Sequence, residues 1–288
     1  MNPAILGTVA ALFWGVHDLV AGIASRKLGH MVVVLGVTLA GFAGLTLWLG
    51  LTGEFPNLQR ADLWVPIVAG AGYASATLFL FAAFATGPFS VAAPVGGSYP
   101  LTSLLIAAVL GTPTSGTQLF MALLVIAGVI IVALTEPEEG DAQAYNKRAI
   151  RQTVIYAGLA HLSFAFAILF GQKAAVLFGA VEGTWISRIA GAVVIGFLFF
   201  AANKKRDLPA KWIAPIAGIG LLDATAICLL NAAGNTSQPQ IAAVAGSAFG
   251  VVTILLARIF LNEAIPPLRW LGIAVTFIGV AALTALGK

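Results

Sequence analysis

Ten long runs of hydrophobic residues, separated by short polar or turn-forming stretches, extend along the chain. Each run is close to the ~20 residues that a helix needs to cross a lipid bilayer. The runs lie at residues 4–24, 31–52, 62–86, 89–110, 117–135, 151–171, 182–202, 212–234, 239–260 and 266–286. Charges, glycine or proline mark the breaks, as at Arg26-Lys27, Gly87-Pro88 and Asn262-Glu263. The pattern therefore predicts an all-α polytopic membrane protein with ten transmembrane helices.

The first hydrophobic run is predicted to be a retained helix and not a cleaved signal peptide. His17 and Asp18 lie inside this run, whereas the hydrophobic region of a signal peptide is apolar and follows its basic residues. Here the basic pair Arg26-Lys27 comes after the run. We therefore count this run as the first of the ten spans.

The composition supports a membrane protein and argues against most soluble classes. Of the 288 residues, 60% are hydrophobic and only 9% are charged, whereas soluble domains carry roughly 25% charged residues. A soluble enzyme, a disordered chain and a nucleic-acid-binding protein are therefore excluded, despite the net charge of +4. The single Cys228 excludes a disulfide within the chain, and no cluster of His, Cys or Asp has the spacing of a metal site.

The two halves of the chain match each other when one is shifted by 150 residues. In the first run of each half, Trp14 coincides with Phe164. In the fourth run of each half, Tyr99 coincides with Phe249. One offset that serves two separate runs indicates an internal repeat.

Each repeat holds five predicted spans, and five is an odd number. The second repeat must therefore enter the membrane from the side opposite to the first, so the two repeats are inverted. We place the first five-helix repeat at residues 1–140, a polar connection at 141–150 and the second repeat at 151–288. Inverted repeats are a common basis of secondary transporters, which bind substrate near the membrane midplane between the repeats.

Small residues suggest where the two repeats meet. The fourth and ninth spans carry matched small residues, which permit close approach of two helices in a membrane. These residues are Ala92, Ala93 and Gly96 in one span and Ala242, Ala243 and Gly246 in the other. We predict that the two spans lie against each other near the axis that relates the repeats.

Basic residues are distributed unevenly between the two sides of the predicted bundle. Of the 15 Lys and Arg residues, 11 fall on the connections that follow odd-numbered spans, three fall on the other side, and Arg188 lies inside a span. Positive charge favours the cytoplasmic side of a membrane. The odd-numbered connections are therefore predicted to be cytoplasmic, with both termini on the non-cytoplasmic side.

Several ionisable residues fall inside the predicted spans, where each costs about 3 kcal/mol to insert and normally faces a partner or a water-filled cavity. His161 and Asp223 are near the centres of their spans, and His17 and Asp18 lie about one turn from the centre of theirs. Asp223 either binds a cation or proton in a transport pathway or forms a structural ion pair, with Arg188 as the candidate partner. The histidines are either proton relays or imidazoles bonded to neighbouring helices.

Aromatic residues near the middle of the spans form a second candidate set. They are Trp14, Tyr73, Tyr99, Phe164 and Phe249. Such residues often serve packing, but the symmetric placement of two pairs favours a shared central cavity whose walls could stack on an aromatic side chain. Together with His17, His161 and Asp223 they are the predicted substrate-binding residues. Asp18 and Arg188 are the candidates for coupling transport to an ion.

The fourth span contains two prolines and two glycines in its middle. They are Pro94, Gly96, Gly97 and Pro100. Proline inside a helix removes a backbone donor and kinks the helix, and the freed groups are tolerated in a membrane where protein or water can satisfy them. We predict a kink in this span, which either serves the substrate pathway or is purely structural.

Three features of the chain point to one family. They are the five-plus-five arrangement of spans, the early Phe13-Trp14-Gly15, and Leu261-Asn262-Glu263 followed nine residues later by Gly272. With these features the whole chain resembles the EamA-type drug/metabolite transporter (DMT) superfamily. The chain departs from the pattern at Thr112-Pro113, where the first repeat lacks the Asn-Glu of the second. The length and the aromatic-rich character are similar to those of bacterial aromatic amino acid exporters.

The resemblance and the site residues together favour a secondary transporter and not an enzyme. The expected transporter exports small amphipathic metabolites across the bacterial inner (plasma) membrane by alternating access. Aromatic amino acids are the preferred substrates. A carrier of nucleotide sugars or sugar phosphates is the alternative within the superfamily, although such anions should require several cations at membrane depth and Arg188 alone qualifies. A channel, which belongs to a different class, would require a continuous polar stripe along several helices.

The expected partners are a small-molecule substrate and membrane lipid, without nucleic acid, cofactor or metal, and the chain is expected to act as a monomer. Two modes of energy coupling are compatible with the sequence. A proton that competes with substrate for a buried histidine or aspartate would let a proton gradient drive export. If these groups are held in structural hydrogen bonds, the protein is a facilitator, which we favour because Asp223 alone is a central acid.

Overall fold

The computed structural model describes residues 2–109, 115–135, 145–202 and 208–285 of the chain. The described part of the first repeat begins with α1 (Pro3–Leu28), α2 (His30–Thr52), η1 (Ala61–Leu63) and α3 (Trp64–Thr86), and continues with α4 (Phe89–Gly97), α5 (Tyr99–Val109) and α6 (Gly116–Leu134). The second repeat begins with α7 (Lys147–Phe178), α8 (Ala180–Ala201), α9 (Ala210–Ala232) and η2 (Ala233–Asn235), and continues with α10 (Pro239–Ser247), α11 (Phe249–Phe260) and α12 (Pro267–Ala285). No strand occurs within these ranges.

The helices agree with the predicted all-helical membrane architecture. Within the described ranges, seven segments are long and apolar enough to cross a membrane, and they comprise α1, α2, η1–α3, α7, α8, α9–η2 and α10–α11. The apolar parts of α6 and α12 are shorter, and α4–α5 occupies the place of the fourth predicted span. The multi-pass membrane class is therefore confirmed, whereas the number of ten spans stays a prediction.

Some residues used in the sequence analysis lie outside the described ranges. They are Thr112 and Pro113, the basic residues Lys204, Lys205, Arg206 and Lys288, and part of the predicted connection at 141–150. Of that connection, residues 147–150 already belong to α7, which begins with the side chain of Asn146 accepting a hydrogen bond from the backbone N–H of Ala149.

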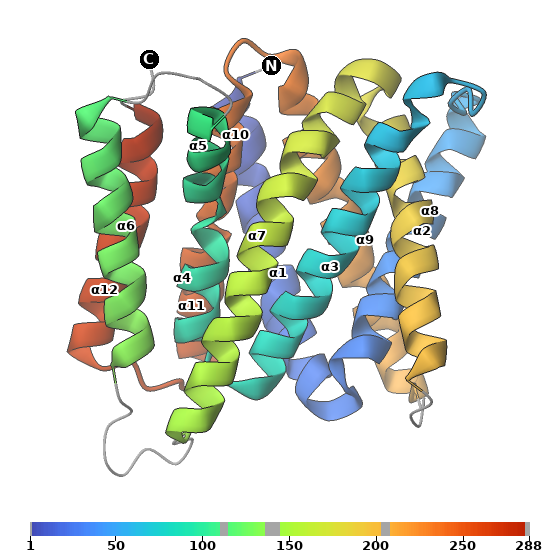
Figure 1. Ribbon diagram of the computed structural model, residues 1–288. Helices are drawn as coiled ribbons and strands as arrows, with labels where there is room; N and C mark the ends of the chain where they lie inside the picture. The colour runs from blue at the N-terminus through green and yellow to red at the C-terminus, as the bar shows by residue number, and fades with distance from the viewer. Residues whose placement is uncertain (1, 110–114, 136–144, 203–207, 286–288) are drawn as a thin grey trace.

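The two repeats run through the molecule in opposite directions (Figure 1). The N-terminus and the C-terminus lie at the same end, α1 begins at that end, and α7 begins at the opposite end. Two tight turns show the repeat locally. Gly29 joins α1 to α2 with φ +87°, and Gly179 joins α7 to α8 with φ +96°. Glycine adopts such positive φ values without the strain of a Cβ atom, so the same turn recurs 150 residues later.

The predicted kink in the fourth span is an interruption of the helix at Ser98, between α4 and α5. The second repeat has the same interruption at Ala248, between α10 and α11, although Val244 and Gly250 stand where the first repeat has prolines. In both places a serine hydroxyl next to the interruption donates to the carbonyl three residues earlier, from Ser98 to Val95 and from Ser247 to Val244. Such local side-chain bonds bend helices without proline.

The fourth and ninth predicted spans do pack together, in part through the predicted small residues: Ala93 contacts α11, and the hydroxyl of Tyr99 on α5 bonds to the carbonyl oxygen of Ala243. Gly250 of α11 lies against α4, where a Cβ atom at Gly250 would be 3.0 Å from the carbonyl oxygen of Ala93. Ala242 and Gly246 also lie against α1, because a Cβ at Gly7 would be 2.3 Å from the carbonyl oxygen of Ala242 and 2.9 Å from the backbone nitrogen of Gly246. The ninth predicted span, α10–α11, therefore packs against α1 as well as against the fourth span, α4–α5.

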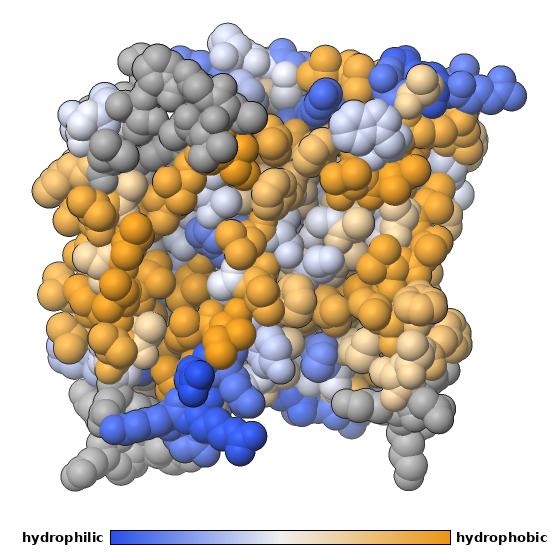
Figure 2. Space-filling view, viewed as in Figure 1, coloured by the Kyte–Doolittle hydropathy of each residue, from blue (hydrophilic) through white to orange (hydrophobic). Residues whose placement is uncertain are grey.

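On the face shown in Figure 2, the middle of the bundle is mainly hydrophobic, and hydrophilic residues are concentrated toward the two ends. Large apolar side chains on this surface include Leu51, Phe197 and Ile278, which are 78%, 73% and 67% exposed. This distribution is the one expected for contact with lipid.

Candidate functional site

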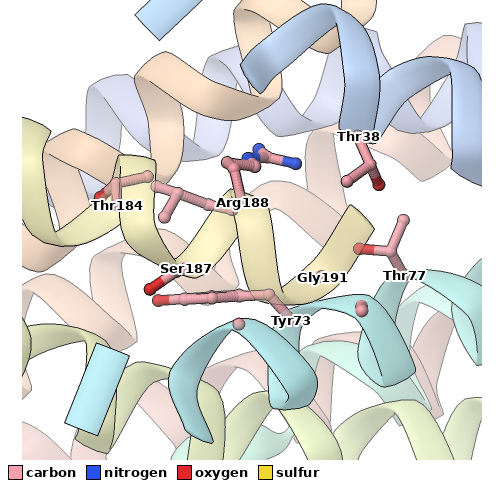
Figure 3. A pocket seen from close by; sticks show the side chains of 10 residues that line it. Thr38, Tyr73, Thr77, Thr184, Ser187, Arg188 and Gly191 are labelled. Carbon is pink, nitrogen blue, oxygen red and sulfur yellow. The ribbon is translucent and has the colours of Figure 1, made fainter. Parts of the chain in front are cut away.

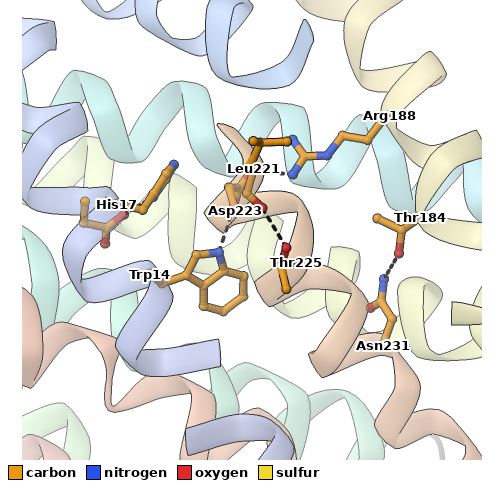
Figure 4. A network of polar contacts seen from close by, with 9 residues as sticks. Trp14, His17, Thr184, Arg188, Leu221, Asp223, Thr225 and Asn231 are labelled. Atoms are coloured by element: carbon orange, nitrogen blue, oxygen red, sulfur yellow. Dashed lines mark hydrogen bonds and ion pairs between the residues drawn. The ribbon is translucent and has the colours of Figure 1, made fainter. Parts of the chain in front are cut away.

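A buried ion pair joins three helices at the centre of the bundle (Figure 4). Nη2 of Arg188 on α8 donates to Oδ2 of Asp223 on α9 at 2.5 Å. The indole Nε1 of Trp14 on α1 donates to Oδ1 of the same carboxylate at 2.8 Å. All three residues are buried. Both carboxylate oxygens of Asp223 are thus engaged, one by each repeat, and the structural ion pair considered from the sequence is present.

His17 and Asp18 form a second polar pair on α1. Nδ1 of His17 and Oδ1 of Asp18 are 2.9 Å apart, and both side chains are buried. The imidazole of His17 packs on the ring of Phe81 from α3, with centroids 5.4 Å apart. Nε2 of His17 has no hydrogen-bond partner among the described residues. This nitrogen therefore remains able to bind a proton, a water molecule or a substrate group.

Four of the five predicted aromatic residues form one cluster around Phe164 of α7. The centroid of its ring lies 5.9 Å from those of Trp14 and Tyr99 and 6.5 Å from that of Phe249. Trp14 and Phe249 also meet edge to face at 5.9 Å. The hydroxyl of Tyr99 donates to the carbonyl oxygen of Ala243 at 2.5 Å. The cluster joins both repeats, and its role in binding substrate stays a prediction.

Tyr73 and His161 lie outside this aromatic cluster. The hydroxyl of Tyr73 on α3 donates to Oδ1 of Asn231 at 2.8 Å, and Nδ2 of Asn231 donates to the hydroxyl of Thr184 at 3.1 Å. His161 on α7 is half-buried and bonds through its ring nitrogens to the hydroxyls of Ser98, at 2.9 Å, and Thr102. His161 thus ties α7 to the interruption between α4 and α5.

Two small cavities lie on either side of the ion pair. The aromatic cavity is lined by Trp14, His17, Asp18, Thr77, Leu80, Phe81, Phe164, Asp223 and Phe249. The hydroxyl cavity (Figure 3) is lined by Thr38, Gly70, Tyr73, Ala74, Thr77, Thr184, Ser187, Arg188, Gly191 and Ile227. Each has room for about one water molecule. In this conformation, therefore, neither cavity admits a metabolite.

The two cavities differ in the chemistry of their walls. The aromatic cavity combines ring faces with the carboxylates of Asp18 and Asp223 and the imidazole of His17. The hydroxyl cavity presents alcohol groups and the guanidinium of Arg188. Thr77 lines both, so the cavities are neighbours separated by the ion pair. Among the described residues, no group of three or more His, Cys, Asp and Glu side chains is arranged as metal ligands would be.

The sequence analysis missed several polar residues of the site. They are Asn231, Thr77, Thr184 and Ser187, which are uncharged, whereas the predicted site residues are ionisable or aromatic. A usable signal exists, because amide and hydroxyl side chains within apolar spans commonly hydrogen-bond between helices. The hydroxyl of Ser187 does so by donating to the carbonyl oxygen of Pro66 on α3 at 2.9 Å.

A separate polar cluster lies away from the cavities, where α11 ends and α4 begins. The carboxylate of Glu263 accepts from the backbone N–H groups of Phe89 and Ser90 at 3.0 and 2.8 Å. Nη2 of Arg269 donates to the carbonyl oxygen of Thr135 at 2.7 Å. This arrangement explains the Asn262-Glu263 motif structurally, because the acid caps a helix of the other repeat.

Two oppositely directed helical repeats with a buried polar centre define a multi-pass membrane protein of the transporter class. The family model described as "EamA-like transporter family" matches residues 1–134 and 151–285. The chain therefore belongs to this family of transporters, and the resemblance seen in the sequence is confirmed at the level of the superfamily.

Individual relatives are more distant. The chain is 25% identical over 211 residues to a Lactiplantibacillus plantarum protein that carries the name "Putative ribose uptake protein RbsU", a match that covers 71% of this chain and 69% of the relative. A protein of known crystal structure has the same fold with a TM-score of 0.66 and 17% identity, over 99% of this chain and 96% of that one.

Proposed function

We propose that this protein is a secondary transporter that moves a small metabolite of zero net charge by alternating access. The observation that carries the proposal is the Arg188–Asp223 ion pair between two neighbouring cavities at the interface of the repeats. Transporters with inverted repeats place their substrate sites at this position. Buried charge at membrane depth is costly and is most often kept for a functional reason.

The proposal includes a bundle of ten spans. In the first repeat, α4–α5 and α6 complete the five, and in the second repeat α12 does so. Their placement beside the longer helices supports this count (Figure 1). We retain residues 1–140 and 151–288 as the repeats, joined by 141–150, whose last four residues already form the first turn of α7. We also propose a bacterial inner membrane location with both termini outside the cytoplasm, because the basic residues are unevenly distributed between the two sides.

Alternating access is supported by the small size of the cavities and by the interrupted helices. A substrate larger than water cannot enter either cavity without movement of the surrounding helices. The interruptions at Ser98 and Ala248 stand at equivalent positions of the two repeats. Because interrupted helices are the moving or binding elements of many transporters, we propose that each interruption serves one of the two opening movements.

Export of aromatic amino acids is the preferred function. Trp14, Phe164 and Phe249 line the aromatic cavity and could stack on an aromatic side chain. Asp223, Arg188 and His17 lie within the same region and supply partners for an ammonium and a carboxylate group. Such partners are required because a zwitterion loses its hydration when it enters the bundle.

A pentose such as ribose is a second candidate. The hydroxyl cavity presents Thr38, Tyr73, Thr77, Thr184 and Ser187, which suit a substrate rich in hydroxyl groups. The name of the Lactiplantibacillus plantarum relative, which refers to ribose uptake, points in the same direction. A nucleotide sugar or sugar phosphate is less suited, because Arg188 is already paired with Asp223. A channel is disfavoured because the cavities are small and separate.

Transport assays on the purified full chain in proteoliposomes test the proposal. Counterflow of radiolabelled phenylalanine is expected when unlabelled phenylalanine is trapped inside, and labelled ribose is measured in parallel under the same conditions. Empty liposomes are the control for leakage. Saturable counterflow of either compound supports a secondary transporter and decides between the two candidates. Linear, non-saturating flux of both compounds would instead indicate a channel.

A further inference from the structure

We propose that the substrate splits the ion pair between Arg188 and Asp223, and that this exchange makes the protein select zwitterions over molecules with a single charge. The inference rests on the proposed function and names its substrate class. It gives the ion pair a role in substrate selection, in addition to its structural role of connecting α8 and α9.

The position of the pair supports an exchange. Asp223 lines the aromatic cavity and Arg188 lines the hydroxyl cavity, so the bond between them crosses the boundary of the two. Thr77 borders both cavities. If the pair separated, the two cavities would join into one chamber with a carboxylate on one wall and a guanidinium on the other. Because each cavity now has room for about one water molecule, the helix movement of the proposed alternating access must also widen this chamber before it holds a metabolite.

Charge balance then limits which substrate can separate the pair. An isolated buried charge is strongly unfavourable, whereas a compensated pair is tolerated. A singly charged anion would pair with Arg188 and leave Asp223 uncompensated, and a singly charged cation would do the reverse. An α-amino acid brings both charges, so its carboxylate replaces Asp223 at Arg188 and its ammonium replaces Arg188 at Asp223. Every charge keeps a partner throughout this exchange.

Local structure prepares both residues for the exchange. Nε1 of Trp14 holds Oδ1 of Asp223, so the carboxylate keeps a neutral donor when Arg188 leaves. Nε of Arg188 has no hydrogen-bond partner among the described residues and can serve as a second donor to a carboxylate. The guanidinium lies close against α2 at Gly41, where a Cβ atom would be 3.3 Å from Cζ of Arg188, so the absence of a side chain at Gly41 makes room for it. Figure 3 shows its side chain extending over the hydroxyl cavity.

The experiment compares four probes in proteoliposomes containing the full chain. Unlabelled phenylalanine, 3-phenylpropionate, phenethylamine and ribose are tested as competitors of labelled phenylalanine counterflow, with direct counterflow of labelled ribose measured alongside. The first three share an aromatic ring and differ in charge. We expect phenylalanine to compete about 30-fold or more better than either singly charged analogue, as removal of one partner from a buried charge pair usually has an effect of this size.

The decisive variant removes both charges together. In Arg188→Gln/Asp223→Asn no charge is left without a partner, so the fold is expected to persist even where each single variant is unstable. The preference for phenylalanine over the two singly charged analogues should then fall to within about threefold. Arg60→Gln/Asp62→Asn is the matched control, because these residues form an exposed ion pair at 3.3 Å outside the cavities. This control should keep the wild-type preference.

Three results would overturn the inference while leaving the proposed transporter in place. The first is a folded double variant that retains the wild-type preference, since the pair would then be structural. The second is wild-type protein on which either singly charged analogue competes as well as phenylalanine. The third is counterflow of ribose without counterflow of phenylalanine. This result would agree with the proposed transporter but would contradict a zwitterion as its substrate. Wild-type protein that moves neither compound would overturn the proposed function and the inference together.

Discussion

Oε1 of Glu263 accepts a hydrogen bond of 2.8 Å from the backbone N–H of Ser90, a residue 173 positions earlier in the chain. Oε2 of the same side chain accepts from the N–H of Phe89 at 3.0 Å. Glu263 follows α11 in the second repeat, and Phe89 and Ser90 begin α4 in the first. A carboxylate is favourable at a helix N-terminus, where free N–H groups and the helix dipole meet it. One buried acid therefore holds the two repeats together at this end.

Replacement of this acid should destabilise the fold. In Glu263→Ala two buried backbone N–H groups lose a charged acceptor, so we expect a loss of about 2 kcal/mol in the free energy of unfolding. The measurement is the thermal midpoint of the detergent-solubilised protein. Glu54→Ala is the control, because Glu54 is exposed in a connection. Equal midpoints for the two variants would show that the Glu263 contacts contribute nothing.

Trp14→Phe tests the contribution of the indole hydrogen bond independently of the aromatic contacts of Trp14. The variant keeps a ring beside Phe164 and Phe249 but leaves Oδ1 of Asp223 without the donor that now lies 2.8 Å away. We expect a loss of about 1–3 kcal/mol in unfolding free energy together with weaker phenylalanine counterflow. Trp48→Phe, at an exposed position, is the control and should alter neither. A fully active and stable Trp14→Phe protein would contradict this role of the indole.

Gly7 is required for close packing of α1 against α10. A Cβ at this position would lie 2.3 Å from the backbone carbonyl oxygen of Ala242, which cannot move away as a flexible side chain could. Gly7→Ala is therefore expected to lower the unfolding free energy by about 2 kcal/mol through overpacking. Gly158→Ala is the matched control on α7, where a Cβ would meet no atom within 4 Å. Denaturation curves of both variants in the same detergent measure the difference.

We expect transport to be facilitative. Asp223 is held by Arg188 and Trp14, and Asp18 is bonded to His17, so both acids have partners. An imposed pH gradient across the proteoliposome membrane should then leave the rate of phenylalanine exchange unchanged and cause no accumulation. His17→Gln and Asp18→Asn should behave as the wild type does in this respect. Accumulation against the phenylalanine gradient that is driven by protons and abolished by His17→Gln would instead identify His17 as a coupling site.

The orientation of the chain is testable by fusion of reporters. Fusions at Lys288 and Lys205 are expected to report the non-cytoplasmic and the cytoplasmic side respectively, because 11 of the 15 basic residues lie on the odd-numbered connections. A pair of reporters, one active in the cytoplasm and one active outside it, gives a positive signal at each site. The reversed pattern would show that both termini are cytoplasmic.

Much of the architecture follows from the sequence alone. Apolar runs of about 20 residues predict membrane helices because the bilayer requires every backbone group to bond within its own helix. The offset of 150 residues between Trp14 and Phe164 also predicted the repeat, whose family model matches both halves. The spans and the repeat are local or periodic properties of the chain, so they can be predicted without knowing which helix contacts which.

Only the tertiary structure decided how the polar groups are paired. The sequence offered Arg188 as a candidate partner of Asp223 but left open whether the two residues pair, and no spacing in the sequence relates Trp14 to Asp223, which lies 209 positions later. The interruption at Ala248 was not predicted, because the second repeat lacks the prolines of the first, although a serine hydroxyl takes part at both interruptions. Side-chain pairing and helix interruption both depend on which neighbour satisfies each polar group inside an apolar bundle, and that is set by the packing of helices distant in sequence.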